Sequence, residues 1–442
     1  MRIQLSDHFT YRKLLRFTLP SIAMMIFTSV YGVVDGYFVS NYVGKTEFSA
    51  LNLIWPFVMI LGTMGFMLGT GGSALVSKNM GEGEGEKANR RFSLFVYLSV
   101  FAGIVIALLG IVTIRPVAGL LGADESLIDH CVLYGRILLV GLPCFMLQQE
   151  FQSFFVTAEK PQLGFVVTVF AGVTNMVLDA LFVAVFGWGL AGAAGATILS
   201  QTVGGVLPVI YFLCPNRSRL RLTKTRMEVR ALLRACANGS SELMSNVSMS
   251  LVSMLYNLQL LHYAGADGVS AYGVLMYVNF VFISAFIGYA IGTAPLIGFH
   301  YGAGNRGELK NLLRKSLLLI GICSLGMLGA AEVLAKPLSL LFVGYDEALL
   351  ALTLRAFRLF SFSFLFAGVA IYGSSFFTAL NNGLVSAMIS FLRTLLFQVA
   401  AVLLLPLWLG IDGIWISVVA AEGMAFVVTI LFLFARKKRY GY

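Results

Sequence analysis

Long apolar runs separated by short polar segments dominate the chain. A helix needs about 20 predominantly apolar residues to cross a bilayer, and twelve runs fit that length within a few residues. They occupy residues 17–40, 48–77, 92–114, 133–157, 163–186, 190–214, 235–262, 269–300, 316–335, 356–379, 384–409 and 411–435. This pattern predicts an all-α polytopic membrane protein with twelve transmembrane helices.

The second half of the chain repeats the first at an offset of 221 residues, which is half of the 442-residue length. Matching pairs include Tyr42–Tyr263, Gly44–Gly265, Gly71–Gly292, Gly81–Gly302, Pro116–Pro337 and Gly189–Gly410. Six spans per half is an even number, so both halves enter the membrane from the same side and the repeat is parallel. We therefore expect two pseudo-symmetric six-helix lobes, residues 1–214 and 235–442, joined by a basic linker at 215–234.

Composition agrees with a membrane protein. Hydrophobic residues make up 58% of the chain and charged residues 12%, whereas soluble domains contain about 45–50% and about 25%. The net charge of +10 could indicate a nucleic-acid partner, but most Lys and Arg fall in the segments on one side of the membrane. That asymmetry predicts cytoplasmic termini and basic residues that face lipids of the inner leaflet of a bacterial cytoplasmic membrane, not nucleic acid.

No motif indicates a metal or a nucleotide cofactor. The five cysteines and four histidines show no metal-ligand spacing. The stretch "GAGNRG" at 302–307 fits G-x-G-x-x-G, but an apolar span precedes it where the dinucleotide fold requires a strand. No Walker sequence occurs, so we expect neither ATP nor another cofactor.

One carboxylate interrupts the first apolar run. Residues 17–44 contain Asp35 as their only charged residue, and its repeat mate is Tyr256. A charged acid in hydrocarbon costs several kcal/mol, so such residues usually face a cavity or a partner and are functional. The alternative is that the acid only fixes helix packing through a buried hydroxyl.

Other polar residues of the first half also lack polar mates. Asn175 and Asp179 lie four residues apart on one face of the fifth span. The mates of Asn175, Asp179, Tyr31 and Thr197 are Leu396, Ala400, Val252 and Val418. Carboxylate, amide and hydroxyl oxygens at similar depth indicate a proton acceptor or a cage for a monovalent cation at Asp35 and Asp179.

The second half has its own candidates. Glu242 in the seventh span and Asn279 in the eighth are expected to line a central substrate cavity with Tyr256. The alternative for Glu242, and for Glu422 in the last span, is a helix-end carboxylate with a hydroxyl or amide partner. Met and aromatic surfaces in such a cavity suit varied organic cations.

Several motifs together resemble the multidrug and toxic compound extrusion (MATE) family. They are "FTLPSIAMM", "VYGVVDGYFVSNYVG", "GEGEGEKANRRF", "NMVLDALF" and "GLAGAAGATILSQ". The resemblance covers the whole chain and is nearer the DNA-damage-inducible and staphylococcal multidrug members than the sodium-coupled vibrio type. It implies a monomeric antiporter that exports bulky organic cations in exchange for H+ or Na+ by rocking of two lobes.

The resemblance also assigns site residues. It places the ion site at Asp35, Asn175, Asp179 and Thr197, with Tyr31 beside it. The family's polar residue of the fourth span falls on Gln149, with Gln152 and Ser153 as alternatives. Some members pair a glutamate of span seven, here Glu242, with an aspartate of span ten, but span ten of this chain contains no acid.

Two other functions are alternatives for a chain of this kind. A lipid-linked oligosaccharide flippase of the same superfamily would need cationic residues in its cavity, and the central parts of the spans contain almost no Arg or Lys. An intramembrane enzyme would need a nucleophile with a base, or a metal cluster, and the sequence has no such set. The sequence thus predicts a transporter and not an enzyme.

Overall fold

The computed structural model describes residues 3–123, 125–344 and 346–442. All regular structure in these ranges is helical. Nine helices in the described part are long and apolar enough to cross a membrane, or up to eleven if each of two bent pairs counts as one span. The predicted all-α polytopic fold is confirmed.

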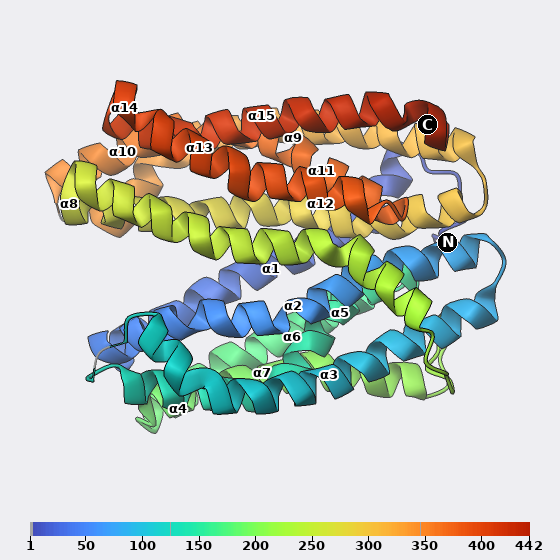
Figure 1. Ribbon diagram of the computed structural model, residues 1–442, viewed down its shortest axis with the longest axis horizontal. Coiled ribbons are helices and arrows are strands. Elements are labelled where there is room, and N and C mark those ends of the chain that lie inside the picture. Colours follow the sequence, from blue (N-terminus) through green and yellow to red (C-terminus); the bar gives the residue numbers. More distant parts are fainter. Residues whose placement is uncertain (1–2, 124, 345) are drawn as a thin grey trace.

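Two helical bundles make up the molecule (Figure 1). The first lobe contains α1 (Tyr11–Tyr42), α2 (Lys45–Gly81), α3 (Gly85–Leu120), α4 (Ile128–Val140), α5 (Leu142–Thr157), α6 (Pro161–Asp179), the π-helical turn η1 (Ala180–Val185) and α7 (Gly189–Leu213). The second contains α8 (Val229–Gly302), α9 (Arg306–Val343), α10 (Glu347–Ser361), α11 (Phe364–Ala379), α12 (Gly383–Phe391), the π-helical turn η2 (Leu392–Leu396), α13 (Phe397–Leu404), α14 (Pro406–Leu409) and α15 (Ile411–Tyr440).

The helix α8 contains two predicted spans. It runs through 74 residues but leaves helical geometry at Gly265, where φ is 64°. Glycine adopts this left-handed conformation without steric cost, so the chain reverses here. The part before Gly265 supplies the predicted span at 235–262, which is more polar than the others.

Two spans expected to be continuous are bent in the structure. The pair α4–α5 bends by 57° and the pair α10–α11 by 49°. The first break lies at Gly141, with Pro143 in the first turn of α5, where proline favours a new helix start. Phe362, the mate of Gly141, lies at the second break, so this bend forms without a glycine.

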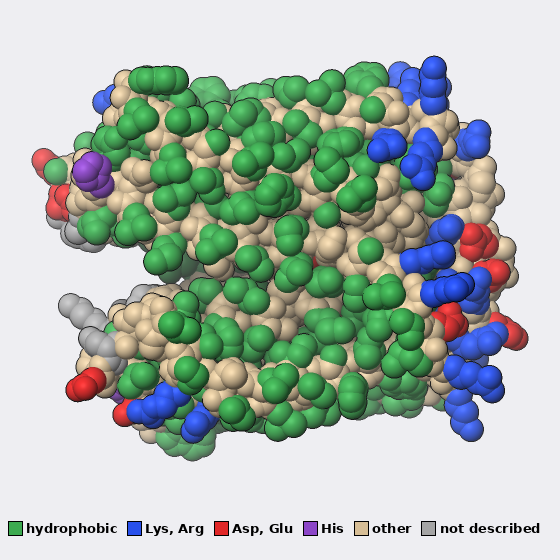
Figure 2. Space-filling model, viewed as in Figure 1, with side chains coloured by type: hydrophobic (Ala, Val, Ile, Leu, Met, Phe, Trp, Pro, Cys, Tyr) green, Lys and Arg blue, Asp and Glu red, His purple; other side chains and the backbone are tan. Residues whose placement is uncertain are grey.

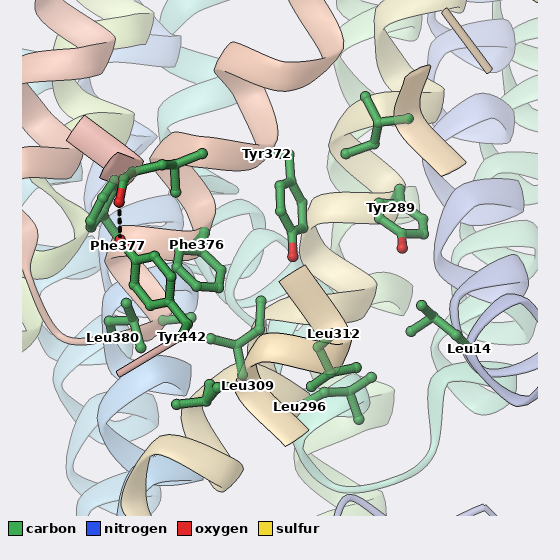
Figure 3. Close-up of a cluster of buried hydrophobic side chains, with 14 of the residues drawn as sticks. Leu14, Tyr289, Leu296, Leu309, Leu312, Tyr372, Phe376, Phe377, Leu380 and Tyr442 are labelled. Atoms are coloured by element: carbon green, nitrogen blue, oxygen red, sulfur yellow. Dashed lines mark hydrogen bonds between the residues drawn. The ribbon is translucent and has the colours of Figure 1, made fainter. Parts of the chain in front are cut away.

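The two lobes share one apolar cluster at the end that holds both termini. Leu14 of α1 lies in this cluster with Leu296 of α8 and Leu309 of α9 (Figure 3). The C-terminal Tyr442 packs edge-on against Phe376 of α11, with ring centroids 5.1 Å apart. Burial of these side chains from both lobes holds the lobes together at this end.

Glycines bring α2 and α8 into close contact at the same end. A Cβ atom at Gly81 would lie 2.0 Å from the carbonyl oxygen of Phe299, and one at Gly302 would lie 2.1 Å from that of Lys78. Gly81 and Gly302 are repeat mates, as are Lys78 and Phe299. The two contacts are therefore equivalent under the pseudo-twofold relation of the lobes.

At the opposite end the lobes separate. Each has its own core there, around Ile54 and Leu139 in the first lobe and around Phe357 and Trp415 in the second. Figure 2 shows a cleft between the lobes at this end, and most Lys and Arg of the visible face at the other. The molecule is a V that is closed at its basic end.

The segment between the lobes lies along α3. The backbone N–H of Thr223 donates to Ser93 Oγ at 2.8 Å, and that of Arg221 donates to Asn89 Oδ1 at 2.9 Å. The next helix begins at Val229, so the last residues of the predicted linker, 229–234, are the first turns of α8.

Candidate functional site

The candidate ion site lies where α1 packs against α6 in the first lobe. Gly172 of α6 makes this approach possible. A Cβ atom there would lie 2.5 Å from the ring of Phe27 and 2.9 Å from that of Tyr31. One turn beyond Tyr31 on α1 is Asp35, and two turns beyond Gly172 on α6 is Asp179.

The two acids face each other. The carboxyl groups of Asp35 and Asp179 are within hydrogen-bonding reach, and Asp179 is fully buried. Neither oxygen of Asp179, nor Oδ1 of Asp35, has a hydrogen-bond donor among the described residues. Because ionised carboxylates only accept hydrogen bonds, a shared proton or a bound cation would stabilise this pair.

Two other predicted site residues lie on α6 itself and on α7, which packs against α6. Asn175, one turn before Asp179, is 2% exposed, and its Nδ2 has no acceptor in the described part of the chain. Thr197 is half-buried on α7, and its hydroxyl donates to the carbonyl oxygen of Ala193 at 3.0 Å. Its lone pairs stay available as acceptors.

A glutamine of α5 interacts with Tyr31. The side chain of Gln148 lies close enough to the Tyr31 hydroxyl to interact with it, and Gln148 is buried. Gln149, to which the resemblance assigned the position, is half-buried. Successive residues of a helix point about 100° apart, so Gln148 and its neighbour Gln149 point in different directions.

Two buried residues of the first lobe, one of them close to the acids, were missed by sequence reasoning. The Tyr134 hydroxyl on α4 is close enough to interact electrostatically with both Asp35 and Asp179. Glu150 of α5 is fully buried beside Ser99 of α3. Neither of its oxygens has a hydrogen-bond partner of normal geometry among the described residues.

A π-helical turn follows the second acid directly. The turn η1 begins at Ala180. Such turns insert an extra residue into a helix and are frequent at functional sites because they redirect the side chains around them.

The equivalent position of the second lobe is neutral and fully hydrogen-bonded. Tyr256, the mate of Asp35, donates to Gln398 Oε1 at 2.8 Å and shares a hydrogen bond with Ser417 Oγ at 2.7 Å. Its ring stacks on that of Tyr272, with centroids 5.4 Å apart. Tyr256 is 1% exposed, so it lies in the interior of its lobe and not on a cavity surface as expected.

The other candidates of the second lobe have separate environments. Glu242 and Asn279 are both half-buried, on the two parts of α8. Arg393 Nε donates to both oxygens of Glu422, at 3.1 and 2.8 Å. Glu422 is thus in an ion pair, whereas the alternative considered for it was a hydroxyl or amide partner.

Comparison with known proteins identifies the family. The MatE family profile matches residues 20–181 and 243–404, one segment in each half. The chain belongs to the MatE family. This confirms the family expected from the sequence motifs and makes the chain a multi-pass membrane protein.

Individual relatives match over most of their length. The chain is 21% identical over 433 residues to the multidrug export protein MepA of Staphylococcus aureus (strain NCTC 8325 / PS 47), covering 97% of this chain and 94% of that protein. It is 22% identical over 367 residues to MepA of Staphylococcus saprophyticus, covering 81% of each.

A solved structure described as the outward-facing conformation of a multidrug resistance MATE family transporter of the MOP superfamily has a TM-score of 0.91. It is 21% identical and covers 98% of this chain and 97% of that one. This likeness supports the two-lobe fold.

The described residues contain no group of three or more His, Cys, Asp or Glu placed to hold a metal ion. The carboxylate pair, with the Asn175 amide one turn away on α6, has the chemistry of a site for a proton or a monovalent cation.

Proposed function

We propose that this protein is a secondary active multidrug efflux antiporter that exports bulky organic cations in exchange for H+ or Na+. The observation that carries the proposal is the Asp35–Asp179 pair, in which three carboxylate oxygens have no donor among the described residues, together with its neutral, hydrogen-bonded counterpart at Tyr256. If these acids only fixed helix packing, the first lobe would supply hydrogen-bond donors to them, as the second lobe supplies partners to the Tyr256 hydroxyl.

Ion binding would favour one arrangement of the first lobe. Asp35 is on α1, which contacts both α6 and α8, and Asp179 precedes the turn η1. A proton or cation between the acids removes their repulsion and draws α1 toward α6. It can drive transport only if the two arrangements of the lobes differ in their affinity for the ion.

We place the basic end in the cytoplasm of a bacterial cell, with the lobes divided at 1–214, 215–234 and 235–442. Both termini lie at that end (Figure 1), and the positive-inside rule gives the direction. The cleft would then open outward from a monomer. A reporter fused after Tyr442 should be active only in the cytoplasm, and activity outside would reverse the orientation.

The flippase alternative gains no support from Arg393. This intramembrane arginine is paired with Glu422, so it does not give the cavity an unpaired cation for a pyrophosphate group.

Ethidium efflux from a pump-deficient host tests the function. Expression should lower ethidium accumulation, and either an uncoupler or removal of sodium should abolish the effect and identify the ion. Asp35→Asn should abolish efflux while the protein still reaches the membrane, and Asp179→Asn should be severe but partial because Asn175 is one turn away.

The control is Ala400→Ser, at the repeat mate of Asp179, which should keep most of the activity. Wild-type efflux in Asp35→Asn, with unchanged pH and sodium dependence, would make Asp35 a packing residue.

A further inference from the structure

A pocket of about 420 Å³ opens at the basic end, where the linker meets α8. Arg91 of α3, in the first lobe, lines it from one side. Glu228, Arg230 and Arg234, from the end of the linker and the first turns of α8, line it from the other. The pocket therefore lies on the junction between the two lobes.

Its charges are fixed on one side and free on the other. Arg91 is 12% exposed; its Nε donates to Glu228 Oε2 at 3.1 Å and its Nη1 to Asn79 Oδ1 at 2.8 Å. Arg230 and Arg234 are exposed and one helical turn apart, and neither forms an ion pair with a described residue. Three guanidinium groups against one carboxylate leave the pocket with an excess of two positive charges.

Apolar side chains lie beside the arginines. Met227, Val229 and Leu233 are 62%, 56% and 63% exposed. Exposed apolar residues next to basic ones are typical of a surface at the boundary between lipid headgroups and acyl chains. Exposing three large apolar side chains to water is unfavourable.

We propose that this pocket binds the phosphate group of an anionic phospholipid of the inner leaflet, with the acyl chains against Met227, Val229 and Leu233. Guanidinium groups bind phosphate through paired hydrogen bonds, and basic pockets on the cytoplasmic side of membrane proteins bind such headgroups. The lipid bridges α3 and α8, so it stabilises the arrangement in which these helix ends are adjacent. The assignment to the inner leaflet rests on the orientation proposed above.

Native mass spectrometry of the purified full chain in detergent measures the binding directly, without transport. Phosphatidylglycerol should bind, and phosphatidylcholine with the same acyl chains should bind much more weakly. In Arg230→Gln/Arg234→Gln, phosphatidylglycerol should bind about 30-fold more weakly, the expected effect of two basic residues. Equal binding in this variant would overturn the proposal.

Lys437→Gln/Lys438→Gln is the matched control, because it removes two exposed charges of the same end from α15. It should bind phosphatidylglycerol as the wild type does. An equal loss would show general surface attraction and no pocket.

Glu228→Gln tests the pocket through an expected increase in lipid affinity, which a misfolded variant would not show. It removes the competing charge but keeps an acceptor for Arg91, so the affinity for phosphatidylglycerol should rise several-fold; no rise would contradict the proposed geometry. A large excess of inorganic phosphate should not displace the lipid. Displacement would show a site for free phosphate and overturn the lipid assignment.

Discussion

At the depth of Asp35, the two halves of the chain differ in the hydrogen-bond partners that they provide for a buried polar side chain. In the second lobe, the Tyr256 hydroxyl has two partners, Gln398 and Ser417. In the first, the mates of those partners are Val177 and Ala196, which can neither donate nor accept through their side chains. With those partners missing and a second acid, Asp179, added, the first lobe has a carboxylate pair that a proton or a cation would stabilise.

Gln148 should be more important than Gln149. Gln148→Ala removes the buried polar side chain that interacts with the Tyr31 hydroxyl, and loss of a polar partner in the protein interior costs about 1–3 kcal/mol. We expect a lower thermal midpoint and weaker ion-driven efflux. Gln149→Ala, at the adjacent half-buried position, is the control and should change both much less. A larger effect at Gln149 would restore the assignment made from the sequence.

Comparison of repeat mates could have found part of what sequence reasoning missed. The mates of Gln148 and Glu150 are Val369 and Ile371, the same polar-to-apolar contrast that indicated Asn175 and Asp179. Tyr134 is different, because its mate Arg355 is also polar. Comparison of mates therefore gives no signal for its proximity to the acids.

At the scale of elements, residues 5–9, before α1, cross the basic end and contact both lobes; we call this segment the strap. The backbone N–H of Leu5 donates to Glu159 Oε1 at 2.9 Å, just beyond α5 in the first lobe. The backbone N–H of Phe9 donates to Glu308 Oε1 at 2.9 Å, and His8 Nδ1 lies 2.6 Å from Glu308 Oε2, on α9 of the second lobe. Both carboxylates are 6% exposed, so the strap ties the lobes together.

Glu308→Ala should release the strap. Hydrogen bonds to a charged group contribute about 1.5–3 kcal/mol each, so amide hydrogen exchange at residues 5–9 should become roughly 10- to 100-fold faster, as measured by mass spectrometry. Asp7→Asn is the control, because the ion pair of Asp7 with Lys13 is exposed and 3.4 Å long, and such pairs contribute little. Unchanged protection in Glu308→Ala would show that apolar burial of Leu5 and Phe9 alone holds the strap.

Hydrophobic runs predict where helices cross the membrane better than where they turn. The run at 133–157 has a visible break signal in Gly141 and Pro143, but the run at 356–379 has Phe362 and Ser363 at its bend. An apolar run also ends at the membrane boundary, but the helices are longer than the runs. The helix α2 continues to Gly81, and α9 already begins at Arg306. The extra turns carry the contacts between the lobes.

At the scale of the whole molecule, the repeat could be read from the sequence but the contact between its copies could not. Gly81 and Gly302 are visible as matching residues in two glycine-rich segments. Their role follows from the position of the pseudo-twofold relation, which brings each against the other half. Ser77 and its mate Gly298 are also in close contact across the lobes, because a Cβ atom at Gly298 would lie 2.2 Å from Ser77 Oγ.

Closure of the basic end should therefore depend equally on Gly81 and Gly302. In either Gly→Ala variant the methyl group would meet a backbone carbonyl about 2 Å away, and overpacking of this kind costs about 1–3 kcal/mol. The equilibrium should move toward the arrangement open at the basic end. Spin labels at the exposed positions Glu86 and Lys310 should then show a longer distance, and ethidium efflux should fall to a similar extent in both variants.

Gly321→Ala is the matched control, because a Cβ atom at this α9 position has no neighbour within 4 Å. It should leave the distance between the labels and the efflux unchanged. If only one of the two glycine variants shifted the distance, the two contacts would differ in energy despite their matched geometry. If neither did, the lobes would be held closed by the apolar cluster around Leu14 and Leu296 and not by the crossing of α2 and α8.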